Sequence, residues 1–288
     1  MLSYRHGFHA GNFADVLKHS LTTLVINALK QKDKPFVYID THAGAGKYSL
    51  KSEFSQKTGE FEQGIGRIWN APEPIAEMKE YLAAIRAENT GKQLLRYPGS
   101  PQLVRRLIRN QDRLQLSELH STDFDALQQL FAQDNQVSVA KENGLEMLNK
   151  KLPPIQKRGF ILIDPSYEMR SDYNHVVEAL TNAHKRFATG IYALWYPVID
   201  RSVTERMLQR LENSGIPRQL RIEHCITADG AMRGMTGSGM LFINPPWQLA
   251  SQAENLLPWL NRILTDDKGQ WKVTWQVPES VAERTERN

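Results

Sequence analysis

An apolar segment of the chain runs directly into four residues whose side chains could do chemistry. The segment covers residues 159–163, and it ends in Asp164-Pro165-Ser166-Tyr167. A short, continuous apolar run is typical of a buried parallel strand, and ligands of open α/β sheets sit just beyond the carboxyl ends of such strands. We therefore expect a carboxylate, a proline-stiffened turn and an aromatic ring to reach one site together.

A second segment that could take part in binding or chemistry follows a predicted strand at 36–40. It reads Asp40-Thr41-His42-Ala43-Gly44-Ala45-Gly46-Lys47. Small residues after a strand let backbone N–H groups approach a ligand closely. The run is neither a Walker phosphate loop nor Gly-x-Gly-x-x-Gly, which argues against a dinucleotide. An acid followed by Gly-x-Gly after a strand indicates the cofactor loop of a methyltransferase.

Polar residues also follow two other predicted strands. The strand at 114–118 ends in Glu118, and an acid at this place in the fold can bind ribose hydroxyls. The strand that begins at Val137 ends in the polar turn Asn143-Gly144, whose position suits a contact with an adenine ring. A solvated glutamate is the alternative for Glu118.

The N-terminal segment is unusual for a frayed end. Residues 3–12 contain two aromatic residues, two histidines and two glycines, whereas frayed termini are mostly plain and polar. Two interpretations of this segment are possible: a functional loop, or a loop that only packs on the domain. A helix is expected from about 12 to 32, and it places Asp15, Lys18 and His19 close together; a solvated face is the alternative.

The order of the remaining elements favours a mostly parallel α/β sheet. Further strands are expected at 190–197, 218–226 and 239–243, with a short one at 271–277. Only a glycine-rich loop that contains Arg233 joins 218–226 to 239–243, and a parallel crossover needs a dozen or more residues, usually helical. We therefore expect an antiparallel hairpin. A parallel sheet closed by such a hairpin is the pattern of class I methyltransferases.

Residues 50–97 interrupt this rhythm with helical spacing and no strand pattern, so we expect a small helical insertion, either a lid or an RNA-gripping arm. A turn at 97–101 then leads into a helix, with Ser100 as N-cap and Pro101 at the first position. That helix is expected to carry arginines that could neutralise phosphates or simply be solvated. They are Arg105, Arg106, Arg109 and Arg113.

Composition limits the class of protein. The 288 residues suffice for one large α/β domain with an insertion. Residues 1–49 and 98–278 are expected to form this domain, and residues 50–97 the insertion. A polar tail, 279–288, is expected to be disordered. The net charge of +4 permits a nucleic-acid partner without demanding one. Cys225 is the only cysteine, which excludes an intrachain disulfide and a cysteine-based zinc site.

The location of the protein is also an expectation from the sequence. No apolar run reaches the roughly 18–20 residues of a membrane span, and the N-terminus lacks the apolar region of a signal peptide. We therefore expect a cytoplasmic protein.

The motifs together resemble the bacterial family that methylates the N6 amino group of an adenine in 23S ribosomal RNA. The resemblance covers essentially the whole chain. It rests on residues 2–6, 9–12, 15–19, 40–46, 97–101, 193–197 and 244–247. The 164–167 turn is similar to the Asp-Pro-Pro-Tyr motif of amino-methyltransferases that use S-adenosylmethionine, with Ser166 in place of the second proline. Some members carry an older label that links them to the use of external DNA as a nutrient.

The resemblance implies a Rossmann-like fold with a seven-stranded, mostly parallel sheet. It implies S-adenosylmethionine as cofactor, protein-free 23S rRNA as substrate, no metal and a monomer. The implied cofactor contacts are His19, His42, Gly44, Gly46, Ser100, Glu118, Asn143, Gly144 and Asp164. The family has aspartate where this chain has Asn143, whose side-chain carbonyl can still accept a hydrogen bond from the adenine amino group. Tyr4 is expected to touch the RNA, and His6 and Lys18 are further site residues.

The resemblance also suggests a mechanism. Asp164 and the carbonyl of Pro165 would each accept one N–H of the adenine amine and orient its lone pair for in-line displacement. Asp164 would then accept the departing proton, while Tyr167 stacks on the unstacked base. The structural alternatives are a helix N-cap for Asp164 and a core position for Tyr167.

Three other functions stay open from the sequence. One is the same chemistry on an adenine of DNA, because only the 2′-OH separates the two substrates. Another is a catalytically silent nucleic-acid-binding protein linked to the use of external DNA. A nuclease would need a clustered carboxylate metal site, and the sequence shows no convincing one.

Overall fold

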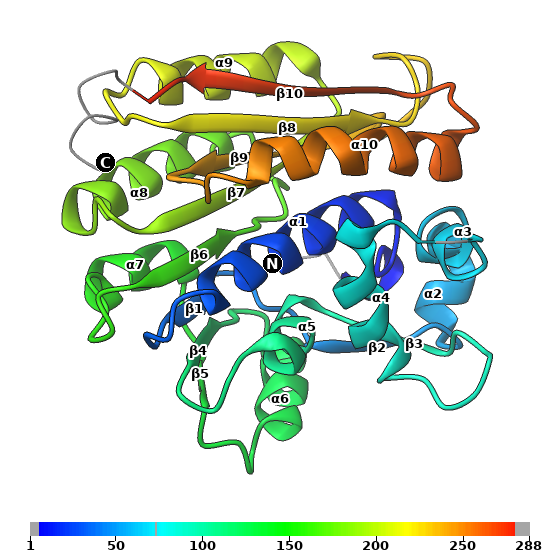
Figure 1. Cartoon of the computed structure of the whole chain (residues 1–288), viewed down its shortest axis with the longest axis horizontal. Coiled ribbons are helices and arrows are strands. Elements are labelled where there is room, and N and C mark those ends of the chain that lie inside the picture. The colour runs from blue at the N-terminus through cyan, green and yellow to red at the C-terminus, as the bar shows by residue number, and fades with distance from the viewer. Residues whose placement is uncertain (1–5, 73, 280–288) are drawn as a thin grey trace.

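The computed structural model describes residues 6–72 and 74–279. Its centre is a sheet of eight strands in the order β10-β8-β9-β7-β6-β1-β4-β5 (Figure 1). Their bounds are β1 Val37–Asp40, β4 Arg113–Ser117, β5 Val137–Ala140, β6 Gly159–Ile163, β7 Ile191–Val198, β8 Gln219–Cys225, β9 Gly237–Ile243 and β10 Gln270–Val277. The expected tail lies almost wholly outside the described residues.

Five of these strands run in parallel, so their carboxyl ends meet at one edge of the sheet. β1 pairs with β4 and β6, β4 with β5, and β6 with β7. β8 and β9 form the expected antiparallel hairpin, in which Cys225 lies opposite Gly237. β10 adds an antiparallel edge strand beside β8, so the sheet has eight strands rather than the expected seven. The mostly parallel α/β fold is confirmed.

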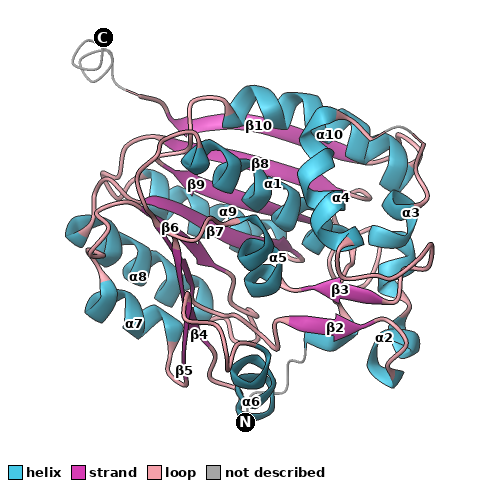
Figure 2. Ribbon diagram, turned by 60° about the horizontal axis from the view of Figure 1, so that its bottom comes forward, coloured by secondary structure: helices cyan, strands magenta, loops and turns pink. Residues whose placement is uncertain are grey.

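Helices cover both faces of the sheet, as Figure 2 shows. One layer contains α1 (Phe13–Lys30), α5 (Ser100–Leu107), α6 (Ser121–Leu130) and α10 (Leu249–Thr265). The other contains α7 (Gly144–Lys151), α8 (Asp172–Arg186) and α9 (Arg201–Glu212). None of the helices in the described ranges is long and apolar enough to cross a membrane.

The central strand β6 is buried on both faces, which explains the unbroken apolar run at residues 159–163. Phe160 and Leu162 belong to the core under α1 and α10, whereas Ile161 and Ile163 belong to the core under α7, α8 and α9. Side chains of a strand alternate between the two faces. A strand buried on both faces therefore cannot alternate apolar and polar residues, and its end delivers Asp164 at a fixed place.

The region expected as a helical insertion packs beside α1, on the right of Figure 1. It contains α2 (Glu53–Thr58), α3 (Ile65–Trp69) and α4 (Lys79–Arg86), with the short 3-10 helices η2 (Glu60–Gln63) and η3 (Ala76–Met78); a further one, η1 (His6–Phe8), precedes α1. A small antiparallel pair, β2 (Lys47–Ser49) and β3 (Arg96–Pro98), joins its two ends. We expected no strand here, because three residues are too few to give an alternating pattern.

Candidate active site

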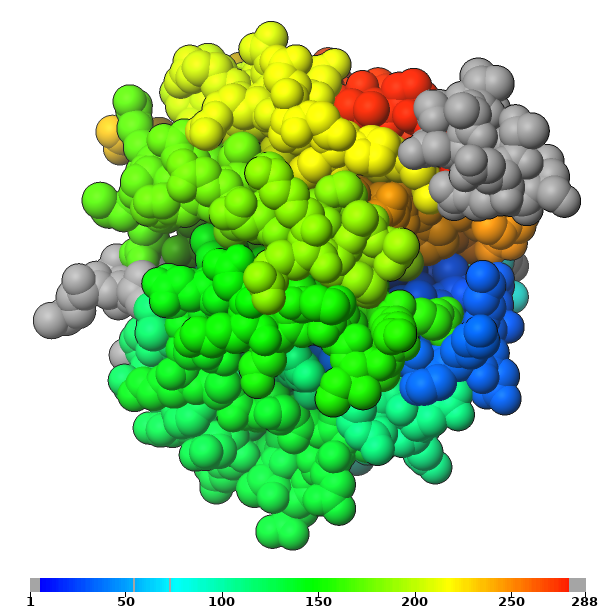
Figure 3. All heavy atoms as spheres, turned by 90° about the vertical axis from the view of Figure 1, so that its left-hand side faces the viewer, coloured from blue at the N-terminus to red at the C-terminus, as the bar shows by residue number. Residues whose placement is uncertain are grey.

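A cavity of about 800 Å³ opens at the carboxyl edge of the parallel strands. Its wall combines the N-terminal segment, the glycine loop after β1, the ends of the parallel strands and the β8–β9 loop, residues 226–236. On the face in Figure 3, the N-terminal residues (blue) border the green middle of the chain. The volume lies in the range of small-molecule and cofactor sites.

The structure brings most of the expected site residues to this one cavity. Those on its wall are His6, Lys18, His19, His42, Gly44, Ser100, Glu118, Asn143, Gly144, Asp164 and Pro165. Gly46 and Tyr167 are not on the wall, and Tyr4 lies outside the described residues. Segments 146 residues apart in the sequence thus meet at one site, as between Lys18 and Asp164.

Two glycines form a cradle in which the backbone is exposed to a ligand. Gly44 has φ +60°, and a Cβ there would lie 2.3 Å from the Tyr48 hydroxyl. A Cβ on Gly144 would lie 1.8 Å from the carbonyl oxygen of Thr41, so the loops after β1 and β5 can approach only without side chains. Gly46, by contrast, packs toward Leu127 and serves the core.

Glu118 lies at the end of β4 and is anchored by backbone groups. The Gly44 N–H donates to its Oε2 at 2.8 Å and the His120 N–H to its Oε1 at 2.7 Å. Burial raises the pKa of Glu118, although the two backbone donors oppose that shift. Each oxygen keeps a further lone pair for a ligand hydroxyl, as expected for a ribose contact.

Ser100 does not act as the N-cap of α5. The helix begins at Ser100 itself, with Gly99 as N-cap, and the Ser100 hydroxyl donates to Oδ2 of Asp40 at 2.6 Å. The Tyr38 hydroxyl donates to the same oxygen at 2.8 Å. Burial raises the pKa of Asp40 to about 6. Because its hydrogen is used, Ser100 presents only a lone pair to the cavity.

Two histidines, the buried His19 and the partly exposed His42, line the cavity as neutral groups. Burial lowers the pKa of His19 to about 3 and that of His42 to about 4. His42 Nδ1 lies 2.7 Å from the Thr41 hydroxyl, and His19 Nδ1 lies 2.7 Å from the Tyr97 hydroxyl. Each ring is thus held by one nitrogen, which leaves the other for a ligand.

Asn143 is the N-cap of α7. Its side-chain oxygen accepts hydrogen bonds from the backbone N–H groups of Leu145, at 3.0 Å, and Glu146, at 3.4 Å. An adenine amino group would have to share this oxygen with the cap. The expected contact between Asn143 and an adenine amino group stays a prediction.

A buried chain of ionic contacts leads from α1 to Asp164. Lys18 Nζ lies 2.6 Å from Asp164 Oδ2 and 2.8 Å from Asp15 Oδ1, and His6 Nε2 lies 2.9 Å from Asp15 Oδ2. Burial alone would lower the pKa of Lys18, but Asp15 and Asp164 outweigh it and raise the pKa. Burial likewise opposes ionisation of Asp15, yet His6 and Lys18 hold the pKa of Asp15 well below its usual range.

The aromatic residue of the 164–167 turn lies elsewhere than we expected. Tyr167 has φ +53°, its ring packs against Tyr173 and Trp195, and its hydroxyl donates to the Trp195 carbonyl at 2.8 Å. Trp195 does line the cavity, with Lys18 Nζ 5.7 Å from its ring centroid. Stacking of Tyr167 on a base therefore stays a prediction, and Trp195 is the ring that the cavity presents in this structure.

Carboxylates outnumber cations on the cavity wall. Seven acids line it, but only two cations, Lys18 and Arg233. The acids are Asp15, Glu60, Glu118, Asp123, Asp164, Glu168 and Asp172. Within the described ranges Arg233 makes no ion pair, and its neighbour Met232 is 49% exposed. Such a wall suits a cationic ligand, and it leaves Arg233 as the cation available to an anion.

The four arginines expected near α5 serve the fold. Arg105 pairs with Asp134, Arg106 with Glu88 at 2.6 Å, and Arg109 with Asp112 at 3.0 Å. Arg113 donates to the backbone carbonyls of Asn110 and Asp112. Two of them also lie outside the helix, which ends at Leu107. These side chains are therefore not a free basic face.

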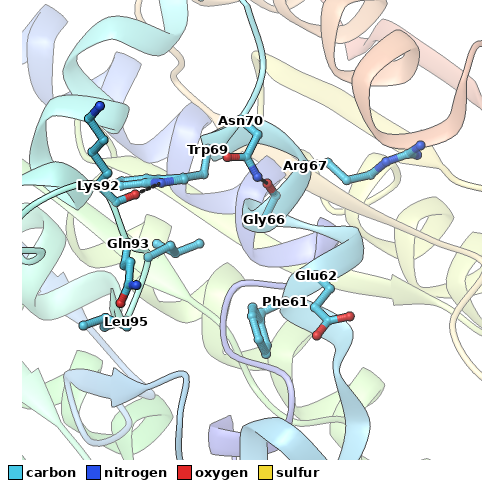
Figure 4. A pocket seen from close by; sticks show the side chains of 10 residues that line it. Phe61, Glu62, Gly66, Arg67, Trp69, Asn70, Lys92, Gln93 and Leu95 are labelled. Carbon is cyan, nitrogen blue, oxygen red and sulfur yellow. Dashed lines mark hydrogen bonds between the residues drawn. The ribbon is translucent and has the colours of Figure 1, made fainter.

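A second hollow, of about 580 Å³, lies on the insertion (Figure 4). The Trp69 ring forms part of it, but its Nε1–H already donates to the Lys92 carbonyl at 3.0 Å. Arg67 points away and bonds the Leu264 carbonyl at 2.7 Å. Among the described residues, no group of three or more histidine, cysteine or acidic side chains could hold a metal ion.

The parallel sheet closed by a hairpin, the glycine cradle after β1 and the Asp-Pro turn after β6 define a class I S-adenosylmethionine-dependent methyltransferase. A family model described as "Ribosomal RNA large subunit methyltransferase D, RlmJ" matches residues 33–277, and the chain belongs to this family. The resemblance seen in the motifs is thereby confirmed.

Relatives match over nearly the full chain. The "Ribosomal RNA large subunit methyltransferase J" of Escherichia coli is 51% identical over 280 residues, covering 97% of this chain and 100% of the relative. The protein of the same name from Haemophilus influenzae is 47% identical over 281 residues, with the same coverage. A crystal structure of protein LPL1258 from Legionella pneumophila is similar with a TM-score of 0.86 and 37% identity, covering 93% of this chain and 98% of that one.

Proposed function

We propose that this protein transfers a methyl group from S-adenosylmethionine to the N6 amino group of an adenine in 23S ribosomal RNA. Family membership and the names of the two curated relatives support ribosomal RNA of the large subunit as substrate. The observation that carries the chemistry is the Lys18–Asp164 contact at the end of β6, in the same cavity as the glycine cradle. This contact supports Asp164 as the carboxylate at which a methyl donor and an amine meet.

The cofactor fits the donors and acceptors of the cavity. When bound, S-adenosylmethionine supplies an electrophilic methyl group on a positively charged sulfur. The cradle at Gly44 and Gly144 offers close backbone approach, and Glu118 offers acceptors for ribose hydroxyls. The excess of carboxylates on the wall favours a cation in the cavity.

Asp164 and Pro165 orient the amine and take up its proton. The lone pair of an exocyclic amine is delocalised into the adenine ring, so the nitrogen must become pyramidal to attack. Lys18 occupies Oδ2 of Asp164, which leaves Oδ1 and the Pro165 carbonyl for the two N–H bonds. As the nitrogen–methyl bond forms and the sulfur–methyl bond breaks, Asp164 accepts the proton that the nitrogen loses.

The target base must leave its stack to reach Asp164. Trp195 offers a ring on the cavity wall, and Tyr167 supports it from behind through the hydrogen bond to its carbonyl. We propose that the base stacks on Trp195 or on a rearranged Tyr167, an interaction worth about 1–3 kcal/mol. Protein-free RNA offers single-stranded segments for this step, and we expect the protein to act as a monomer in the bacterial cytoplasm.

The test uses S-adenosylmethionine with a labelled methyl group. Protein-free, unmodified 23S RNA, DNA and a sample without nucleic acid are incubated in parallel, and the label is mapped by nuclease digestion. We expect N6-methyladenine in the RNA alone. Label in DNA alone would replace the proposal with a DNA methyltransferase, and cofactor binding without transfer to either substrate would favour a silent binding protein.

A further inference from the structure

Three buried side chains connect the cavity to the helical insertion. His19 on α1 lies with Nδ1 2.7 Å from the Tyr97 hydroxyl, which lies 2.9 Å from the Tyr81 hydroxyl on α4. The three residues are at most 1% exposed. Of the three, only His19 lines the cavity, so the contacts run from the cavity wall into the insertion.

The donor and acceptor of each hydrogen bond follow from Tyr81, the residue farthest from the cavity. Within the described part of the chain, Tyr81 has Tyr97 as its only side-chain hydrogen-bond partner. If the Tyr81 hydroxyl accepted this bond, its own proton would be buried without an acceptor, which costs more than an unused lone pair. Tyr81 therefore donates to Tyr97. The Tyr97 proton then goes to His19 Nδ1, since the hydroxyl has one proton to give.

A neutral imidazole that accepts at Nδ1 carries its proton on Nε2. Burial lowers the pKa of His19 to about 3, so the ring is neutral near pH 7. No described residue bonds Nε2, and the ring forms part of the cavity wall. The ring therefore offers a bound molecule a donor rather than an acceptor.

We propose that Tyr97, fixed by Tyr81, holds His19 in the Nε2–H tautomer, so that His19 donates a hydrogen bond to the carboxylate of the cofactor's methionine moiety. The identity of the cofactor rests on the proposed function. The carboxylate is the strongest acceptor that the cofactor offers. Ser100, whose hydrogen is bound to Asp40, presents a lone pair and suits the neighbouring ammonium group.

This inference assigns a task to the insertion. Tyr81 reaches the cofactor only through Tyr97 and His19, so it is a positioning residue. Together Tyr81 and Tyr97 fix which nitrogen of His19 carries the proton, because the hydrogen bond made by one ring nitrogen sets the protonation of the other. The insertion thus acts on the cofactor side of the cavity, whatever its contacts with RNA.

The first experiment reads the tautomer directly in the ligand-free protein. ¹⁵N-histidine is incorporated, and long-range ¹H–¹⁵N NMR spectra are recorded near pH 7, with His19→Gln used for assignment. We expect His19 to be protonated on Nε2 in the wild type and to lose this preference in Tyr97→Phe. A wild-type ring protonated on Nδ1 would overturn the inference, whatever the activity of the enzyme.

The second experiment compares two ligands by calorimetry. S-adenosylhomocysteine carries the carboxylate, and 5′-methylthioadenosine lacks the whole amino-acid part. We expect Tyr97→Phe to weaken binding of the former about three- to tenfold and to leave the latter unchanged, with a smaller effect for Tyr81→Phe. Equal weakening of both ligands would show a merely structural role and refute the inference.

Tyr192→Phe is the matched control. Tyr192 is also fully buried, and its hydroxyl bonds the carbonyls of Ala183 and Phe187, away from the cavity. It should lose stability without a change in either affinity. A wild type that binds neither ligand would instead refute the proposed cofactor, while the NMR spectra still decide the tautomer.

Discussion

Lys18 Nζ lies 2.6 Å from Asp164 Oδ2, although the two residues are 146 positions apart in the chain. The lysine side chain is 4% exposed and that of Asp164 13%. A buried charge is stable only when it is paired, so the ammonium group fixes the carboxylate at the end of β6. The carboxylate that we propose as the proton acceptor is therefore positioned by a helix near the N-terminus.

Replacement of Asp164 separates its chemical role from cofactor binding. Asp164→Asn keeps the shape of the side chain but removes the proton acceptor and places an amide beside Lys18. We expect kcat for RNA to fall about 10²- to 10⁴-fold, while the Kd for S-adenosylhomocysteine changes only a few-fold. Near wild-type turnover in this variant would rule out Asp164 as the base.

Ser100→Ala should make stability more sensitive to pH. Burial raises the pKa of Asp40 from 3.8 to about 6, and the Ser100 hydroxyl opposes this shift. Because the folded pKa lies above the unfolded value, stability is full below about pH 3.8 and is lost as the pH rises through about 6. Removal of the hydroxyl raises the pKa further, so the stability deficit of the variant should grow between pH 5 and pH 8.

The stability deficit of Ser100→Ala should grow by about 1.4 kcal/mol for each pH unit by which the pKa of Asp40 rises further. Urea unfolding at pH 5 and pH 8 measures this growth. Ser20→Ala is the control, because Ser20 is buried and bonds only the Leu17 carbonyl. Its deficit should be the same at both pH values. A constant deficit for Ser100→Ala as well would contradict the raised pKa of Asp40.

Arg233→Gln tests how RNA approaches an acid-lined cavity. Carboxylates repel phosphates, and Arg233 is the cation at the mouth that makes no ion pair among the described residues. We expect the KM for RNA to rise about two- to fivefold and the slope of log K against log salt to fall by about 0.7–0.9. The affinity for S-adenosylhomocysteine should not weaken.

Arg262→Gln provides the comparison for this measurement, because Arg262 is exposed on α10, away from the cavity. It should leave the KM and the salt slope unchanged. An identical effect of both substitutions would indicate general charge attraction and no specific role for Arg233.

Tyr167 can be tested as a stacking residue or as a core residue. Tyr167→Phe loses the hydrogen bond to the Trp195 carbonyl, which should cost about 1 kcal/mol of unfolding free energy at an unchanged KM for RNA. Tyr167→Leu also loses the ring. From the packed position seen here, we expect Tyr167→Leu to lower stability further while the KM stays within about twofold of wild type. A rise of fivefold or more in the KM of Tyr167→Leu alone would show that the ring meets the base.

Local sequence patterns predicted the helices and strands that carry the site. They could not predict contacts between residues that are far apart in the sequence. The apolar run before Asp164, the glycines after β1 and the short loop before β9 each had a direct structural meaning. Ser100 was misjudged because its hydroxyl bonds Asp40, sixty positions away. Tyr167 was expected at the cavity because a motif states residue type, but its ring packs against Tyr173 and Trp195 in this structure.

Two signals were present in the sequence but carried too little information alone. Tyr81 lies in the region expected to be a helical insertion, but nothing in the local pattern marks its hydroxyl, and only the fold brings it to Tyr97. Arg233 lies in a glycine-rich loop whose short length predicted a hairpin. The sequence did not indicate that this loop forms part of the cavity wall.

The acid-rich wall bears on turnover as well as on binding. Methyl transfer converts a sulfonium cation into a neutral thioether, so the attraction between the donor and the carboxylates of the wall weakens in the step that consumes the donor. We therefore expect the cavity to bind the spent cofactor more weakly than a fresh donor. Competition binding should show this preference shrinking as salt screens the charges, and a preference that is independent of salt would contradict it.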